Sequence, residues 1–397
     1  GADCIVGYGG GTVLDVAKVV GALASKGSTP EQAQNFFANV RHALLEQRRT
    51  YAPVVLPSHF EPLPVFLFPT MFGSGAEVSD AAVVRVRGAS DRMRISFEFE
   101  SLRDKSQQDP SESSESSDQA PRTDSQYPQE KNLVSPRINL LVDPRLALKL
   151  QDPLDVAIGG MNAACMCIES ILARNRTGMS IALASDGLSR AAQNIPTAIA
   201  NSKDDRAVTE LLQATLYGGL ARETCGLGVA ASTAIHLGVR FRYRLSYILL
   251  MPALIELAVE EASSRSDSVA LQMIQSCARL AAQKEEATSR DLIDWLYRMI
   301  GDLKLPPFDN EILRDDARMN DLATAIVNGG GLFSDSTPFY DLTPKKILVL
   351  IQRTMEGTKG NPVQKMEEDG QNIDSSPMWS SASTATLDFR ADFGDEE

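Results

Sequence analysis

The first residues of the chain place an apolar segment directly before three consecutive glycines, and this arrangement strongly constrains the fold. Residues 4–8 have the apolar character of a short strand, and Gly9, Gly10 and Gly11 follow. Glycines have no Cβ, so their backbone N–H groups approach a ligand closely, and the N-terminus of the helix predicted next favours an anion. The segment therefore predicts a nucleotide pyrophosphate site, although a tight strand-to-helix turn without a ligand would need the same glycines.

A second segment of the same kind lies further along the chain. Residues 63–68 form another short apolar run, and the loop at residues 69–77 contains two glycines together with the hydroxyl groups of Thr70 and Ser74. Continuously apolar strands are typical of a buried parallel sheet, and such sheets bind ligands at the carboxyl ends of their strands. We therefore expect the two glycine loops to lie side by side at one edge of the sheet.

Three segments of the chain resemble the iron-containing (group III) alcohol dehydrogenase superfamily, which includes glycerol dehydrogenases and maleylacetate reductases. Residues 9–18 match the family pattern GGGSxxDxAK, residues 69–77 correspond to PTTAGTGSE, and residues 142–148 are similar to DPxLTL. The resemblance spans residues 1–357. It implies a dehydroquinate-synthase-like fold, in which an α/β part with an incomplete parallel sheet precedes an all-α domain.

The resemblance also implies that the cofactor is NAD or NADP. Two residues, Thr70 and Ser74, are expected to line the nicotinamide side. Asp15 and Lys18 carry over from the family motif, and their plainer alternative is charge at a helix start on the surface. The residues expected to contact the pyrophosphate are Gly9, Gly10, Gly11 and Thr12.

Two acidic stretches of low complexity set the domain boundaries and carry most of the net charge of −13. Both are rich in serine and acidic residues and poor in groups that form a core, so we expect disorder there. The predicted organisation is a partial nucleotide-binding α/β domain at residues 1–150 with a disordered acidic insertion at 104–130. A helical domain at 151–357 and a disordered acidic tail at 358–397 follow.

Outside these motifs, the sequence predicts one further pair of strands and the kind of surroundings and partner that the protein has. Alternating residues at 82–87 and 92–99 predict a β-hairpin. No cluster of basic residues favours nucleic acid, and no run of eighteen apolar residues or signal peptide favours a membrane. We expect a cytoplasmic protein whose five cysteines are reduced and whose partner is a small carbonyl or alcohol substrate.

The metal site that the resemblance implies is degenerate in this sequence. The family binds iron or zinc through an Asp and three His, the first two in a GMDAxxH pattern. Here Asn162 stands for the Asp and Met166 for the first His, while the other two positions fall near Ala231 and Tyr243. An amide and a thioether are poor ligands for a hard divalent cation, so no metal is expected.

Histidines are too few for a site of the family type. The chain contains His42, His59 and His236. With a one-residue gap His236 matches a family histidine and is a candidate proton donor, and the plainer alternative is a histidine packed on an apolar helix. Three arginines are spaced by two, at Arg240, Arg242 and Arg244. They are candidates to bind a carboxylate substrate, and the alternative is that their side chains face solvent.

Two functions remain open from the sequence. Maleylacetate reductases carry a GMNA pattern, which residues 160–163 match, so one candidate is an NAD(P)-dependent oxidoreductase that reduces a carbonyl or oxo acid. The other is a catalytically inactive family member with a binding or regulatory role. Family members also have strands before the glycine strand. Their absence here is expected to reflect a fragment or a truncation, and a homodimer is one way to cover the sheet edge left exposed.

Overall fold

The computed structural model describes the two domains but not the acidic stretches. The described residues are 2–24, 29–32, 34–35, 38, 42, 51–56, 62–79, 81–85, 92–99, 137–150, 153–237, 242–308, 311–328 and 337–358. Of residues 51–56, 84–85 and 92–99 only the backbone is described. The insertion predicted at 104–130 and the tail predicted after Thr358 lie outside this part of the chain.

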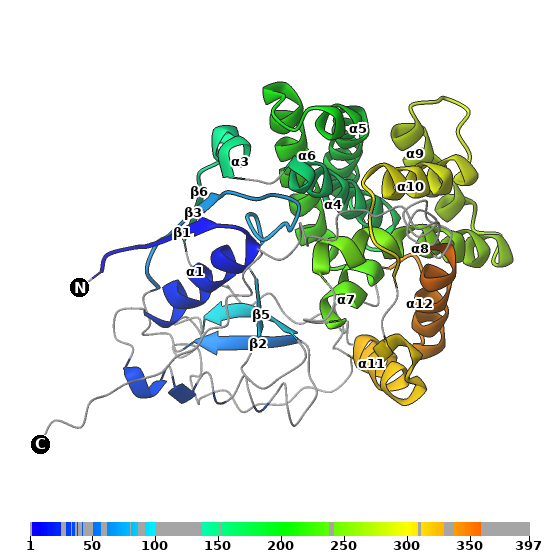
Figure 1. Cartoon of the computed structure of the whole chain (residues 1–397). Coiled ribbons are helices and arrows are strands. Elements are labelled where there is room, and N and C mark those ends of the chain that lie inside the picture. Colours follow the sequence, from blue (N-terminus) through cyan, green and yellow to red (C-terminus); the bar gives the residue numbers. More distant parts are fainter. Residues whose placement is uncertain are drawn as a thin grey trace, which may run out of the picture.

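The glycine strand belongs to a small parallel sheet, as expected. Strand β3 (Val65–Pro69) lies between β1 (Ile5–Gly9) and β6 (Ile138–Leu140), and both neighbours run parallel to it. Helix α1 (Gly11–Leu23) covers one face of this sheet, and its Leu14 and Ala17 pack against Val65 and Leu67 (Figure 1). This arrangement confirms the α/β N-terminal part predicted from the sequence.

A second sheet contains the predicted hairpin. Strand β4 (Ala82–Arg85) pairs antiparallel with β5 (Arg92–Phe99), which confirms the pairing predicted from the alternating pattern. Strand β2 (Tyr51–Leu56) joins the other edge of β5 in parallel, which the sequence pattern did not predict.

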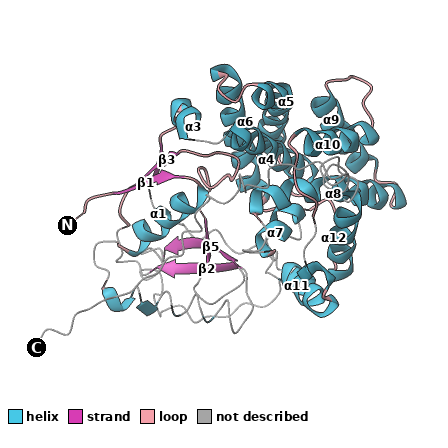
Figure 2. Cartoon of the chain, in the orientation of Figure 1, coloured by secondary structure: helices cyan, strands magenta, loops and turns pink. Residues whose placement is uncertain are grey.

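From Pro144 onward the described residues form helices, as Figure 2 shows. The helices are α3 (Pro144–Leu150), α4 (Pro153–Leu172), α5 (Gly178–Ala200), α6 (Asp205–Cys225), α7 (Val229–His236), α8 (Tyr243–Ser264), α9 (Ser268–Ala282), α10 (Ser289–Asp302), α11 (Asp316–Asn328) and α12 (Pro344–Thr358), with a 3₁₀ turn at Glu311–Arg314. Helix α12 ends within one residue of the boundary predicted at 357.

Side-chain caps define the start of several of these helices. Thr177, Asp204, Asp267 and Thr288 each accept a hydrogen bond from the backbone N–H three residues later. Such caps satisfy N–H groups that have no partner inside the helix, so these residue types mark the helix starts in the sequence.

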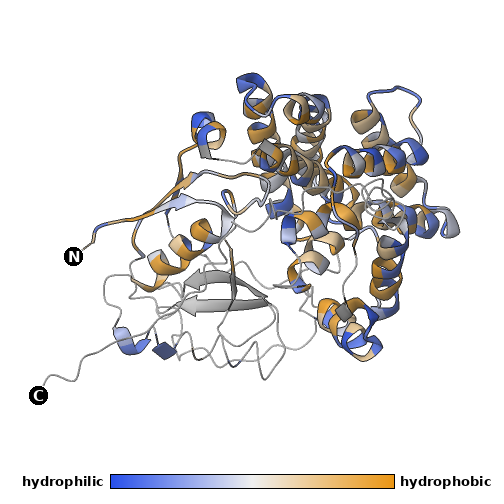
Figure 3. Ribbon diagram, viewed as in Figure 1, coloured by the Kyte–Doolittle hydropathy of each residue, from blue (hydrophilic) through white to orange (hydrophobic). Residues whose placement is uncertain are grey.

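Helix α4 forms the centre of the helical domain and packs against α5, α6, α8 and α9. It is long and apolar enough to cross a membrane, but 89% of its apolar stretch is buried inside the protein, as in a core helix. Apolar residues, orange in Figure 3, dominate where the C-terminal helices meet, and polar residues, blue, gather at outer turns. Helix α4 is therefore the central buried helix of this domain.

Glycines allow the closest helix contacts. A Cβ on Gly218 of α6 would lie 3.1 Å from the carbonyl oxygen of Ala163 and 3.0 Å from Sγ of Cys167, both on α4. A Cβ on Gly301 of α10 would meet no atom within 4 Å.

The same substitution at these two glycines is expected to have opposite effects. Gly218→Ala forces α6 away from the α4 backbone and should lower the free energy of unfolding by about 1–3 kcal/mol. Gly301→Ala fills open space in a helix and should raise it by about 0.5–1 kcal/mol. Urea unfolding followed by circular dichroism measures both, and a stabilised Gly218→Ala would contradict the packing described.

Candidate functional site

The two glycine loops lie side by side at the carboxyl ends of β1 and β3. Gly9 and Pro69 are partners in the parallel ladder, and the N–H of Thr70 donates to the carbonyl oxygen of Gly9 over 3.0 Å. Gly10 precedes α1 and no side chain caps this helix, so its first N–H groups point towards the loop edge without a side-chain acceptor. The position of the two loops confirms that they lie side by side at one edge of the sheet. A helix start of this kind suits an anion.

Glycine is needed where the loops touch. A Cβ on Gly11 would lie 2.8 Å from Oγ of Ser74, so a larger residue at position 11 would separate the first loop from the second. Gly73 and Gly75 have φ of +92° and +71°, a region that residues with a side chain rarely adopt. The glycines therefore serve the geometry of both loops.

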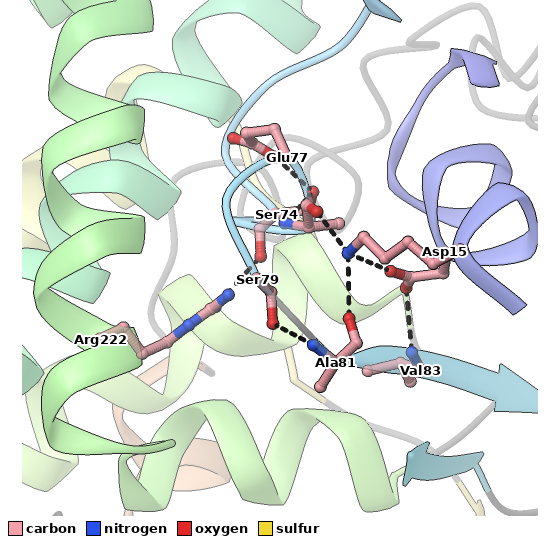
Figure 4. Close-up of polar contacts among 9 residues, drawn as sticks. Asp15, Ser74, Glu77, Ser79, Ala81, Val83 and Arg222 are labelled. Atoms are coloured by element: carbon pink, nitrogen blue, oxygen red, sulfur yellow. Dashed lines mark hydrogen bonds and ion pairs between the residues drawn. The ribbon is translucent and has the colours of Figure 1, made fainter. Parts of the chain in front are cut away.

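Asp15 and Lys18 join helix α1 to the second loop from inside the protein. The Lys18 ammonium donates to Oδ1 of Asp15 over 3.2 Å, to the carbonyl oxygen of Ala76 over 2.6 Å and to that of Ala81 over 2.9 Å. The other Asp15 oxygen accepts from the N–H of Val83 over 3.1 Å. Figure 4 shows this network between α1, the loop and β4.

The surface-charge alternative for these two residues is wrong, because both are buried. Burial raises the pKa of the Asp15 carboxyl, and the neighbouring Lys18 charge opposes that rise. An ammonium has three N–H donors, and protein oxygens take all three of Lys18. We therefore expect Lys18 to act on a cofactor through the position of the loop, while direct contact by Asp15 and Lys18 stays a prediction.

Arg222 of α6 reaches the second loop from the helical domain. Its Nη1 donates to the carbonyl oxygen of Ser74 over 3.0 Å, and Figure 4 shows the side chain directed from its helix towards the loop. On the same loop, Oγ of Ser74 donates to Oε2 of Glu77 over 3.2 Å. Burial raises the pKa of the Glu77 carboxyl, and the positive charge of Arg222 is among the groups that oppose this rise.

The first two degenerate metal positions lie on α4. Asn162 is fully buried, and its Nδ2 donates to the carbonyl oxygens of Ile158 over 2.8 Å and of Arg244 over 3.0 Å. Met166 is also buried, and its Sδ lies 3.0 Å from where a Cβ on Gly75 would stand. Both side chains are thus part of the contact between α4, α8 and the second loop.

The other two degenerate positions meet at Glu169, one turn further along α4. The carboxylate of Glu169 accepts from the N–H of Ala231 over 3.3 Å and from the hydroxyl of Tyr247 over 2.7 Å. The ring of Tyr243 packs on that of Tyr247, with centroids 5.7 Å apart. Glu169 and Tyr247 therefore connect the positions of Ala231 and Tyr243, whereas Asn162 and Met166 make their own contacts on the same helix, α4.

These four positions do not fit a divalent metal. The four side chains supply one amide that donates two hydrogen bonds to backbone carbonyls, one thioether, one methyl group and one phenol, which are poor donors for iron or zinc. In the part of the chain that the structure describes, no group of three or more His, Cys, Asp or Glu is arranged to hold a metal ion.

Glu169, which binds Ala231 and Tyr247, is a residue that sequence reasoning missed. Burial raises the pKa of its carboxyl to about 7, against the hydrogen bonds from Tyr247 and two backbone N–H groups, which lower it. The signal in the sequence was a lone acid in the apolar second half of α4, since such a residue needs buried partners.

His236 and Arg244 bind other groups of the protein. His236 is buried at the end of α7, and its Nδ1 donates to the carbonyl oxygen of Ser232 over 2.8 Å. This bond suits the packed alternative, and proton donation by His236 stays a prediction. Arg244 binds the Asp155 carboxylate over 2.8 Å, Arg242 is exposed, and Arg240 lies outside the described residues.

Two family models match the chain. The model described as iron-containing alcohol dehydrogenase matches residues 1–100, and that of the Fe-containing alcohol dehydrogenase family, C-terminal, matches residues 156–327. The chain belongs to the iron-containing alcohol dehydrogenase superfamily.

Curated relatives are distant. The chain is 25% identical over 236 residues to the NAD-dependent methanol dehydrogenase of Bacillus methanolicus, covering 59% of this chain and 48% of the relative. It is 26% identical over 238 residues to the 4-hydroxybutyrate dehydrogenase of Cupriavidus necator, covering 60% and 48%. The chain thus spans about half the length of the curated relatives it matches.

Solved structures share the fold. An iron-containing alcohol dehydrogenase from Thermococcus thioreducens aligns with a TM-score of 0.62 and 18% identity, over 90% of this chain and 78% of that one. Maleylacetate reductase from Rhizobium sp. strain MTP-10005 aligns with a TM-score of 0.56 and 16% identity, over 90% and 75%. These likenesses support the predicted fold class.

Removing the Lys18 charge is expected to destabilise the protein strongly. Lys18→Met leaves the buried Asp15 carboxylate without its cation and should lower the free energy of unfolding by about 3–5 kcal/mol. Lys284→Met, which breaks an exposed pair with Asp291, should change it by less than about 1 kcal/mol. Denaturant unfolding compares them, and equal effects would contradict the role of Lys18.

Glu169 is expected to make stability depend on pH. Its pKa is about 7 in the folded protein against an ordinary 4.5, so between these values only the folded state keeps the proton. The free energy of unfolding of the wild type, minus that of Glu169→Gln, should therefore fall as pH rises from about 4.5 to 7. The slope should be at most about 1.4 kcal/mol per pH unit. Unfolding curves of both proteins across this range test the prediction, and parallel pH profiles would refute it.

Proposed function

We propose that the chain is an NAD(P)-dependent oxidoreductase that reduces a carbonyl or oxo acid, as maleylacetate reductases do, without the metal site of its superfamily. The observation that carries the proposal is the pair of glycine loops held together by the Thr70–Gly9 hydrogen bond and by the close approach of Gly11 to Ser74. Membership of the superfamily supports the reaction type.

The cofactor is proposed to bind across these loops. The backbone N–H groups at the start of α1, near Gly10 and Gly11, receive the pyrophosphate, and the hydroxyl of Thr12 assists them. Thr70 and Ser74 line the nicotinamide side because they follow the neighbouring strand. The buried Asp15–Lys18 pair keeps the second loop at the distance that this binding needs.

The reaction proposed needs polar groups at the carbonyl oxygen. A bound nicotinamide supplies the hydride, which goes to the carbonyl carbon, and the oxygen then takes a proton. Preorganised donors in a dry site can stabilise the negative charge that develops on this oxygen.

The alternative is an inactive member that binds a nucleotide and serves a binding or regulatory role. The observation that favours it is the use of Asn162 in two structural hydrogen bonds where the family has a metal ligand. We further propose a cytoplasmic homodimer in which a second copy covers β1, where Val6 and Tyr8 are 60% and 52% exposed.

Cofactor binding is expected to need the contact between the two loops. NADH and NADPH titrated into the full chain should quench or shift fluorescence, and Gly11→Val should weaken the binding at least tenfold because its side chain would strike Ser74. Gly301→Ala, far from the loops, is the matched control and should bind as the wild type does. The absence of binding to wild type at millimolar cofactor would remove the oxidoreductase proposal.

Elemental analysis and activity separate the remaining alternatives. The purified protein should contain neither iron nor zinc in stoichiometric amount, because the four degenerate positions are poor ligands. The rate of oxidation of the reduced cofactor is measured with maleylacetate and with simple aldehydes. A higher rate with maleylacetate indicates an oxo-acid reductase, and a higher rate with aldehydes indicates an alcohol dehydrogenase. Binding of cofactor without turnover of any of these would favour the inactive member.

A further inference from the structure

Arg222 is a buried cation at the junction of the two domains. Arg222 lies on α6 and is 7% exposed. Helix α6 packs against α4 and α5 in the helical domain. Its side chain extends out of that domain to the second glycine loop (Figure 4). A guanidinium stays charged at any physiological pH, so this position holds a permanent positive charge.

No acid in the described residues forms an ion pair with this guanidinium. Its Nη1 donates to the carbonyl oxygen of Ser74, and its Nε is buried without a hydrogen-bond partner. The charges of Glu223 and Glu77 act on Arg222 and help to raise its pKa against the effect of burial. Neither acid, however, forms an ion pair with it, and the carboxyl group of Glu77 is hydrogen-bonded to Ser74. A buried charge without a direct counter-ion is costly, and an anionic ligand would relieve that cost.

The position of the guanidinium indicates which ligand it meets. A Cβ on Gly75 would lie 2.2 Å from Nη2 of Arg222 and 3.0 Å from Sδ of Met166. Arg222 and Met166, the position that the resemblance gives to the first metal-binding histidine, therefore both lie against the second loop at Gly75. The pyrophosphate loop before α1 belongs to the other strand, β1.

We propose that Arg222 binds the carboxylate of an oxo-acid or hydroxy-acid substrate, a role that rests on the proposed oxidoreductase function. A planar guanidinium can donate two parallel hydrogen bonds to a carboxylate, which fixes its orientation as well as its charge. The binding of a carboxylate here selects acids over neutral alcohols and aldehydes. Arg222 also places a positive charge close to Met166, where the resemblance implies a metal cation in the superfamily.

The test compares a charged and an uncharged ligand of similar size. 4-Hydroxybutyrate and 1-butanol are titrated by calorimetry into the full chain, with and without saturating NAD⁺. Wild type should bind 4-hydroxybutyrate at least tenfold more tightly than 1-butanol, and Arg222→Met should lose at least tenfold for the acid alone, as expected for a charge-assisted hydrogen bond. Arg222→Lys should keep part of the preference. Arg353→Met, which breaks an ion pair with the exposed Glu260, is the matched control.

Three outcomes would overturn the proposal. They are equal affinity of wild type for both ligands, no change of acid binding in Arg222→Met, and a loss of NADH affinity in Arg222→Met that matches the loss for the acid, which would assign Arg222 to a cofactor phosphate. If Arg222→Met does not fold, Arg222→Lys and the wild-type preference still decide. The NADH titration of wild type is separate, so a failure of the oxidoreductase proposal is recognised independently.

Discussion

The buried ammonium of Lys18 is the contact on which the rest of the candidate site depends. It holds the carbonyl oxygens of Ala76 and Ala81 beside α1, and its partner Asp15 holds the start of β4. Together with the hydrogen bond from Thr70 to Gly9, this pair sets the spacing between the helix start that suits an anion and the second glycine loop. Because both charges are buried, the pair is stable only when both members are present, so the two loops and the second sheet form one unit.

The second constraint is the centre of the helical domain, where the superfamily binds its metal. At the positions that the resemblance gives to the ligands, this chain has amide, thioether, methyl and phenol groups; Asn162 is bonded to the backbone, and Glu169 to the backbone at Ala231 and to Tyr247. Positive charge is nevertheless retained nearby, because Arg222 reaches the second loop beside Met166. The electrostatic character of the centre is thus consistent with the reduction of an anionic substrate, while the ligand chemistry of the family is not retained.

Much of the fold could be predicted from local patterns. Short apolar runs before glycines predicted β1, β3 and the neighbouring loops, and alternation predicted the β4–β5 pair, because both signals depend on residues close in the chain. The parallel pairing of β2 with β5 was missed, since strand partners distant in sequence leave no local signal. The same limit explains why a surface position remained open as the alternative for Lys18. Its burial depends on oxygens 58 and 63 residues away.

The sequence by itself determined that this chain belongs to a dehydrogenase superfamily and that Asn162 and Met166 stand where the resemblance implies metal ligands, since both conclusions depend on residue identity and spacing alone. The tertiary structure decided what stands there instead. Glu169, Arg222 and Tyr247 come from three helices, and a buried charge acquires its partners and its pKa only when those helices pack. The proposal of a ligand for Arg222 could therefore arise only from the folded chain, where this permanent cation is buried and forms no ion pair with an acid among the described residues.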